Sequence, residues 1–342
     1  MRAIMLKAPM DISIQDVPPP EKMTGEVMIK VHGMGICGSD IAAYRGVNPL
    51  VSYPRIIGHE IAGEVLDAPP GDAPLKPGDR VVIEPYVYCG ECYPCTNGRT
   101  NCCENLKVRG VHVDGAMAEF CSHPRHLVHK VPAGVSWERL AMVEPLTISV
   151  HAVKRARMVK GEHLVVTGAG PIGLLAALYA RVVGAVPIVV DPIDERLATA
   201  RALGIPFGIN PERENAVSRI REITHGRLAE AVIEASGSGV AIRSSIDYVA
   251  YSGRVALVGW PKAEVSLPTA LFTKKEVDVV GSRNSRRAFA ESIELVSAGK
   301  IDVTAMITRT ISFEEAPDAV REIATSPEKF MKVVALLSQR GE

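Results

Sequence analysis

Residues 163–173, His-Leu-Val-Val-Thr-Gly-Ala-Gly-Pro-Ile-Gly, decide how the middle of this 342-residue chain folds. The first five form a short apolar run, as in a strand that is buried inside a parallel sheet. Glycines follow at positions 168, 170 and 173, and a helical run of apolar residues extends from there to position 183. The order of strand, glycine turn and helix predicts the start of an alternating α/β fold.

Short apolar segments recur downstream at 188–191, 232–235, 254–259 and 277–281, with helical patterns between several of them. Such alternation predicts a doubly wound parallel sheet with helices on both faces. We expect this Rossmann-type domain to occupy residues 151–279.

The sequence before this region predicts a β domain. Segments 25–32, 61–66 and 79–85 are short, apolar or alternating, and bounded by Gly, Pro or Asp. Residues 280–342 return to a mixed pattern, and we expect them to fold back onto the N-terminal part. The predicted second domain therefore comprises residues 1–150 and 280–342.

The three glycines have the spacing G-x-G-x-x-G, which binds a dinucleotide when it follows a strand and opens a helix. They permit a tight turn, a close approach of the backbone to a pyrophosphate, and close packing of the helix on the strand. Free N–H groups at the start of the helix then donate to the phosphates. The predicted cofactor-binding residues here are Gly168, Gly170, Pro171, Ile172 and Gly173.

Asp191 ends the next predicted strand, where an acid is expected to bind the ribose of a dinucleotide. A carboxylate accepts hydrogen bonds from the ribose hydroxyls and repels the 2′-phosphate of NADP, so NAD is the predicted cofactor. Arg196 lies close enough to bind a phosphate, and we keep it as a candidate cofactor-binding residue. The simpler interpretation of Arg196 is a solvated position on a helix.

The overall composition argues against several classes of partner. Lys and Arg number 39, as do Asp and Glu, so no global field attracts nucleic acid or an anionic membrane. The start of the chain has no signal-peptide pattern, and the longest apolar run, 172–180, is too short to span a bilayer. We therefore expect a cytoplasmic protein that binds neither nucleic acid nor membrane.

Five of the seven cysteines fall within fifteen residues, which indicates a metal site. Four thiolates in one loop match the tetrahedral coordination of a structural zinc ion, and the predicted ligands are Cys89, Cys92, Cys95 and Cys103. An iron–sulfur cluster would also accept four thiolates. By spacing alone, Cys102 could replace Cys103. We otherwise interpret Cys102 and Cys121 as small buried apolar residues.

A second set of metal-binding residue types comes from three separate segments. Cys37 lies in Cys-Gly-Ser-Asp, His59 and Glu60 lie in Gly-His-Glu, and Glu144 lies in Glu-Pro-Leu. Cysteine, histidine and carboxylate are the ligands of a catalytic zinc that keeps one position open. No single segment is diagnostic, because a lone cysteine or histidine is more often part of a core.

As a set, these segments resemble the zinc-dependent medium-chain dehydrogenases over nearly the whole chain. The resemblance rests on the order and separation of 35–40, 58–60, 143–146 and 168–173, with the four-cysteine loop and Asp191. The Glu-Pro-Leu segment resembles the polyol branch, which includes sorbitol, galactitol-phosphate and threonine dehydrogenases. Segments 98–106, 110–112 and 281–284 are most similar to sugar-acid oxidoreductases of the L-galactonate or L-gulonate 5-dehydrogenase type.

The resemblance implies a GroES-like β domain, with a catalytic zinc in the cleft between it and the Rossmann domain. It implies that Cys37, His59 and Glu60 ligate this zinc, and that Glu144 is a further ligand or holds the zinc-bound water. By the same similarity Ser39 contacts the substrate hydroxyl and starts its deprotonation. The resemblance also favours Cys103 over Cys102 as the fourth structural ligand, and it suggests a homodimer or homotetramer.

One position departs from the family pattern. Family members commonly carry a histidine that leads the proton to solvent, and this chain has Ala42 there. The outer part of the proton path must therefore differ. Tyr44 lies close by in the sequence, but it is interpreted equally well as a packing residue.

The sequence thus predicts an NAD-dependent enzyme with one catalytic and one structural zinc, which oxidises a secondary alcohol of a sugar acid or polyol. A substrate carboxylate would be held at a distance from the acidic zinc site, and the candidates for binding it are Arg109, His112, Arg283 and Asn284. Sorbitol-like polyols and a threonine-like amino acid are alternative substrates. Two other classes of protein are alternatives to this enzyme. One is a metal-free quinone or enone reductase, and the other is an NAD-binding regulator or structural protein that retains the fold. The two predicted metal sites argue against both.

Overall fold

The computed structural model describes residues 1–71 and 75–337, and the chain divides into two compact units. The first consists of Met1–Glu144 and Phe289–Glu342, and the second of Pro145–Ala288. The sequence analysis placed these divisions at 150/151 and 279/280. The second division lies further along the chain because β16 (Asp278–Gly281) pairs within the parallel sheet of the second unit.

The long strand β3 (Glu26–Ile36) is the centre of the first unit. It pairs antiparallel with β5 (Glu60–Asp67), β9 (Phe120–Pro124) and β18 (Lys332–Leu336). Beyond these neighbours the sheet continues to β6 (Arg80–Ile83) and β10 (Val128–Lys130) on one side and to β17 (Ile307–Ser312) on the other. A three-stranded sheet has the strand order β2 (Asp11–Asp16), β1 (Arg2–Ala8) and β4 (Arg55–Ile56). A two-stranded sheet consists of β7 (Tyr86–Val87) and β8 (Lys107–Val108).

Short helices fill the connections of this unit. They are α1 (Gly38–Tyr44), α2 (Tyr93–Thr96), α3 (Trp137–Ala141), α10 (Phe289–Ser297) and α11 (Ala316–Thr325). Single 3-10 turns occur at Thr100–Cys102, Arg125–Leu127, Thr304–Met306 and Pro327–Lys329. Helix α4 (Val143–Arg155) begins just before the first division of the chain.

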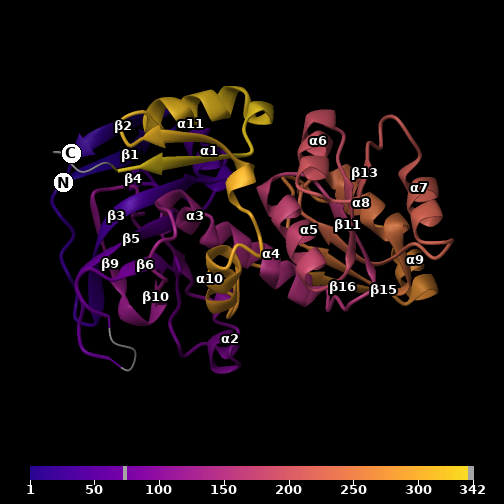
Figure 1. Cartoon of the computed structure of the whole chain (residues 1–342), viewed down its shortest axis with the longest axis horizontal. Coiled ribbons are helices and arrows are strands. Elements are labelled where there is room, and N and C mark those ends of the chain that lie inside the picture. Colours follow the sequence, from indigo (N-terminus) through magenta and orange to yellow (C-terminus); the bar gives the residue numbers. More distant parts are fainter. Residues whose placement is uncertain (72–74, 338–342) are drawn as a thin grey trace. The chain divides into compact units, whose positions relative to one another are not determined.

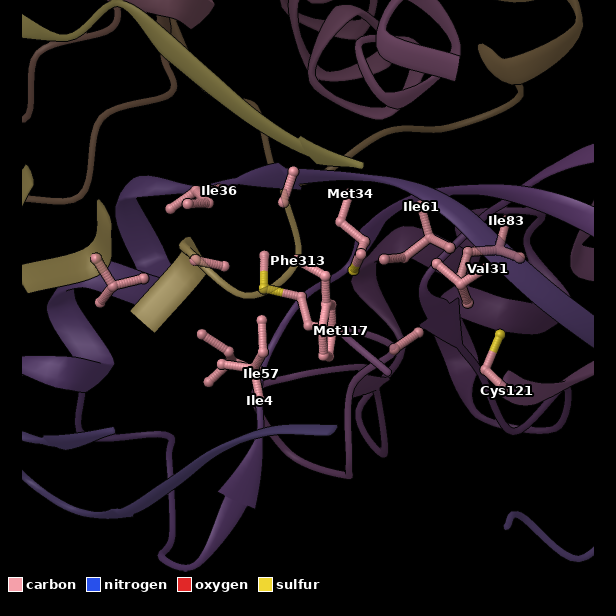
Figure 2. Close-up of a cluster of buried hydrophobic side chains, with 14 of the residues drawn as sticks. Ile4, Val31, Met34, Ile36, Ile57, Ile61, Ile83, Met117, Cys121 and Phe313 are labelled. Carbon is pink, nitrogen blue, oxygen red and sulfur yellow. The ribbon is translucent and has the colours of Figure 1, made fainter. Parts of the chain in front are cut away.

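Side chains from distant parts of the sequence form the core of the first unit. Figure 2 shows Ile4, Val31, Ile61, Met117 and Phe313 in this cluster, and each is almost fully buried. Phe313 follows β17 and comes from the C-terminal part of the chain, which is therefore an integral part of the β unit. Because burying an aromatic side chain of this size contributes a few kcal/mol, the tail is fixed by packing as well as by the β18–β3 pairing.

The second unit is a six-stranded, fully parallel sheet in the order β13-β12-β11-β14-β15-β16. This is the order of the Rossmann fold, and helices cover both faces of the sheet (Figure 1). The strands are β11 (His163–Thr167), β12 (Val186–Val190), β13 (Phe207–Ile209), β14 (Ala229–Glu234), β15 (Val249–Leu257) and β16. The helices are α5 (Pro171–Val182), α6 (Asp194–Ala202), α7 (Ala216–Ile223), α8 (Gly239–Tyr248) and α9 (Thr269–Lys275).

The predicted fold class is confirmed: a mainly antiparallel β unit, in which only β17 and β18 of the described strands pair in parallel, accompanies a doubly wound parallel sheet. Over residues 1–71 and 75–337, none of the helices combines the length and the apolar character that a membrane crossing requires.

Candidate active site and metal centres

A thiol, an imidazole and a carboxylate come together where β3 ends and β5 begins. Cys37 directly follows β3, while His59 and Glu60 lie at the start of β5, and Glu60 is paired with Gly35 across the two strands. Ligand atoms of Cys37, His59 and Glu60 all lie within 4.8 Å of one another. His59 and Glu60 are buried and Cys37 is half-buried. This donor set fits zinc, which binds thiolate, imidazole and carboxylate together.

The electrostatics of this site favour a cation. Burial lowers the pKa of His59, but the Cys37 thiolate and the Asp40 and Glu144 carboxylates outweigh it and raise that pKa well above its usual value. The same negative charges would stabilise a divalent ion. The three donors predicted to bind the catalytic zinc are therefore assembled in surroundings that suit it.

Glycine is required at Gly35 because of the carboxylate opposite it. A Cβ atom at this position would overlap Oε2 of Glu60. The glycine preceding His59, Gly58, has a positive φ of 96°, and a side chain there would overlap Met117. The two glycines thus allow the ligand-bearing strands to approach each other closely.

Asp40 holds the two ligand-bearing segments together. Its carboxylate accepts hydrogen bonds from the backbone N–H groups of Cys37, at 2.9 Å, and Gly58, at 3.3 Å. Oδ1 also lies 3.9 Å from Nδ1 of His59. Burial raises the pKa of Asp40. The sequence motif contains this acid, but its bridging role depends on the fold.

Lys332 is a component of the site that the sequence analysis missed. It begins β18, its side chain is 3% exposed, and its ammonium group forms an ion pair with Glu60. Burial lowers the pKa of Lys332, but the charges of Glu60 and Cys37 outweigh burial and raise this pKa above its usual value. A lysine opening an apolar strand, Lys-Val-Val-Ala-Leu, was the only sequence signal for it.

Glu144 is buried in the first turn of α4 and accepts a hydrogen bond from the hydroxyl of Tyr86, a residue the sequence analysis also missed. Burial raises the pKa of Glu144 to about 7. Among the described residues, the close group of possible ligands contains Cys37, His59 and Glu60 but not Glu144. Direct ligation by Glu144 therefore stays a prediction.

Ser39 lies in the first turn of α1, two residues after Cys37, and is half-buried. Tyr44, at the end of α1, is 4% exposed and belongs to the hydrophobic core cluster, so packing is the interpretation that the structure favours. Ala42 is half-buried on the same helix.

The cysteine-rich loop brings together the four thiols with the predicted zinc-binding spacing. Sulfur atoms of Cys89, Cys92, Cys95 and Cys103 lie within 4.8 Å of one another. Cys102 ends a 3-10 turn outside this group, so the structure favours Cys103 as the fourth ligand. Backbone N–H groups of Cys92 and Glu91 lower the pKa of Cys89 to about 6, which favours the thiolate that binds metal.

Cys121 differs from these thiols. It is buried in the apolar core of the first unit (Figure 2), and burial raises its pKa to about 11. It is the small buried residue that the sequence predicted.

The glycine turn of the second unit has the geometry that nucleotide binding requires. Gly168 has a φ of 97°, and a Cβ at Gly173 would overlap the carbonyl oxygen of Gly168. At Gly170, the N-cap of α5, no atom lies within 4 Å of the position a Cβ would occupy. Pro171 and Ile172 open the helix behind this turn. The open face at Gly170 leaves room for a phosphate beside the helix N-terminus.

Asp191 directly follows β12 and is 2% exposed. Its Oδ2 accepts a hydrogen bond from the N–H of Ala169 at 2.7 Å, and its Oδ1 accepts one from the N–H of Ile193 at 2.9 Å. Arg196 approaches Asp191 to 3.7 Å. The acid thus also holds the glycine turn in place, a role that the sequence analysis did not include.

The candidate carboxylate-binding residues differ in their surroundings. The Arg109 guanidinium donates to Nδ1 of His123 at 2.8 Å and to the backbone carbonyls of Asp114 and Ser122. Nδ1 of His112 accepts a hydrogen bond from the N–H of Val108 at 3.1 Å. These contacts favour structural roles for both residues.

Arg283 and Asn284 lie in the segment that follows β16. Arg283 is exposed, and Asn284 is half-buried with a positive φ of 49°. The two residues belong to the second unit.

Comparisons with known proteins agree with this geometry. Residues 23–133 match the alcohol dehydrogenase GroES-like domain, and residues 171–298 match the zinc-binding dehydrogenase domain. An uncharacterised zinc-type alcohol dehydrogenase-like protein of Haemophilus influenzae is 49% identical over 98% of both chains. The L-galactonate-5-dehydrogenase of Escherichia coli is 38% identical over 92% of both chains. A solved alcohol dehydrogenase of Escherichia coli CFT073, complexed with NADH, superposes with a TM-score of 0.91 at 31% identity and covers 98% of this chain and 99% of its own.

The chain belongs to the zinc-type medium-chain dehydrogenase family. It is a zinc-type oxidoreductase, as the sequence analysis predicted, and solved structures of similar fold hold NADH or NADP. The interpretations as a metal-free reductase or a non-catalytic protein are not supported.

Proposed function

We propose that this enzyme oxidises a secondary hydroxyl of a five- or six-carbon sugar acid, of the L-gulonate or L-galactonate kind, and transfers the hydride to NAD. The observation that carries the proposal is the close donor set of half-buried Cys37 with buried His59 and Glu60, beside Ser39 on the adjoining helix turn. The similarity to L-galactonate-5-dehydrogenase supports the choice of substrate class.

The chain's own residues have distinct roles in this reaction. Cys37, His59 and Glu60 would hold the catalytic zinc, which as a Lewis acid makes the substrate alkoxide accessible near neutral pH. Ser39 accepts a hydrogen bond from the substrate hydroxyl and passes the proton outward. The glycine turn and Asp191 would hold NAD, which when bound would supply the hydride acceptor for the oxidation.

The charges around the metal site favour keeping a substrate carboxylate at a distance. Asp40, Glu60 and Glu144 are all buried acids there, and Lys332 offsets one of them. A second carboxylate next to this group would be repelled. We therefore assign its recognition to Arg283, whose planar guanidinium can bind a carboxylate through two parallel hydrogen bonds, with Asn284 beside it.

Paired substrates test this assignment. We expect the catalytic efficiency on an aldonate to exceed that on the matching alditol by about 10- to 100-fold, the value of a charge-assisted contact of roughly 1.5–3 kcal/mol. Replacing Arg283 with alanine should remove most of that preference, whereas Arg227→Ala, at another exposed arginine of the second unit, should not. Equal efficiencies on both substrates, or a preference that survives Arg283→Ala, would favour a neutral polyol such as sorbitol.

Cofactor preference tests Asp191. Replacing it with serine should lower kcat/KM for NAD by about tenfold or more, because charge-assisted hydrogen bonds to the ribose are lost. The same change should improve the use of NADP. Asp194→Ser, at a more exposed acid in the first turn of α6, is the matched control and should change neither value much. A wild-type enzyme that prefers NADP would contradict the role assigned to Asp191.

We further propose a cytoplasmic location, which the free thiols of the cysteine loop support, and assembly into a homodimer or homotetramer, which the family resemblance suggests.

A further inference from the structure

A buried ammonium group lies at the metal site. Lys332 is 4% exposed, and the carboxylate with which it pairs, Glu60, is 1% exposed. A buried cation beside three candidate metal ligands is unusual, because it opposes the charge of any metal that binds there. Its presence therefore requires an explanation beyond packing.

The register of the sheet fixes where this lysine lies. In the antiparallel pairing of β18 with β3, Val334 is opposite Gly35 and Val333 is opposite Ile36. Lys332 precedes Val333 and so lies next to the point where the chain reaches Cys37. On the other side of β3, Gly35 is paired with Glu60. The backbone N–H of Lys332 also donates to the hydroxyl of Thr308 at 3.2 Å. The ammonium group is thus held beside Glu60 by the same strands that present the metal ligands.

Two cations must share one carboxylate in the metal-loaded enzyme. Glu60 is paired with Lys332 and is also one of the three side chains whose donor atoms cluster within 4.8 Å. Each cation weakens the hold of the other on the carboxylate, and the screening by water is small at this depth.

We propose that Lys332 is a positioning residue that withholds part of the Glu60 carboxylate from the metal, lowers the affinity of the site, and keeps Glu60 an exchangeable ligand. The inference rests on the proposed metal-binding role of Cys37, His59 and Glu60. Without the ammonium group, Glu60 would be a buried carboxylate whose best remaining partner is the metal. An exchangeable Glu60 leaves a coordination position for the substrate oxygen.

The test is the rate at which a strong chelator removes zinc from the full-length, zinc-loaded enzyme. In the wild type, the kinetic phase of zinc release that belongs to the site of Cys37, His59 and Glu60 is the phase that is absent in Cys37→Ala. Lys332→Met, which keeps the length of the side chain but not its charge, should slow that phase at least about tenfold, which corresponds to about 1.4 kcal/mol. Lys332→Arg should stay within about threefold of the wild type. Lys275→Met removes another buried lysine, which donates to backbone carbonyls of the second unit, and should leave the rate unchanged.

A second comparison holds even if Lys332→Met does not fold. Glu60→Gln and the double variant Glu60→Gln/Lys332→Met both lack the carboxylate for which the cations compete. The two should release zinc at the same rate, because the effect of Lys332 acts through Glu60. In cobalt-substituted enzyme, the visible spectrum of Lys332→Met should differ from the wild type, while that of Lys332→Arg should match it.

The outcomes separate the possible failures. An unchanged or faster zinc release in Lys332→Met, or different release rates in Glu60→Gln and the double variant, would overturn the positioning role of Lys332. If instead the wild type had no phase that depends on Cys37, the metal site itself, and with it the proposed function, would be wrong.

Discussion

Replacing Cys37 with alanine is expected to yield a folded protein that retains one zinc per chain and has lost activity by about a thousandfold or more, roughly 4 kcal/mol of transition-state stabilisation. The fold should survive because Cys37 is only half-buried and its contact with Asp40 is made by the backbone N–H, which alanine retains. Activity should fall because Cys37 is one of the three proposed donors to the catalytic zinc. Zinc content, thermal unfolding and NADH formation measure the three parts of this expectation.

Cys121→Ala is the control for the loss of a thiol. Cys121 is buried in the core and lies outside both groups of candidate ligands, so this variant should keep two zinc ions and its activity, with some loss of stability. Full activity in Cys37→Ala, or two zinc ions per chain in that variant, would refute the assignment of the catalytic site.

Much of the Rossmann unit could be predicted because its signals are local. The strand, glycine turn and helix of residues 163–183 are contiguous, and their spacing alone carries the nucleotide-binding geometry. Strand β13 was missed because it spans only Phe207–Ile209 and is defined by parallel pairing with β12. Such pairing has no short-range pattern in the sequence.

The candidate metal ligands could be picked out of the sequence because each lies in a short motif, and the fold brings them together as two groups. The residues around them were missed because they meet the site only in three dimensions. Lys332 and Glu60 are separated by 272 positions, and only the pairing of β18 with β3 brings them together. In the same way, the contact between Tyr86 and Glu144 depends on how α4 packs, which no motif specifies.

Two individual residues show the limits of assigning roles by residue type. Arg109 follows the cysteine loop and was a reasonable candidate for binding an anion. In the fold its guanidinium is held by His123 and by two backbone carbonyls. Asp191 was predicted to bind ribose, and it also accepts two backbone N–H groups at the glycine turn. Hydrogen bonds to the backbone are the part of a residue's role that the sequence conveys least.

The cysteine loop should depend on metal for its structure, and Cys95→Ala is expected to show this. Cys95 is buried among the four clustered thiols, and its loop contains only the one-turn helix α2 and one 3-10 turn as regular structure. Such a loop has little apolar core of its own, so zinc binding supplies much of its folding free energy. We expect Cys95→Ala to lose one zinc per chain and to be cut by proteases within residues 89–103. It should also be less stable by about 4–5 kcal/mol, more than most point mutations cost, because loss of a metal is among the causes of unusually large effects.

Cys102→Ala is the matched control, because it removes a thiol from the same loop. Cys102 lies outside the four-sulfur group, so this variant should keep both zinc ions and unfold at nearly the wild-type temperature. The comparison also decides between the two candidates for the fourth ligand, since zinc lost from Cys102→Ala but kept in Cys103→Ala would reverse the assignment. Iron in place of zinc in the purified protein would instead identify the cluster as an iron–sulfur site. If the protein holds two zinc ions, keeps both in Cys102→Ala and loses one in Cys95→Ala, the result supports a structural zinc bound by Cys89, Cys92, Cys95 and Cys103.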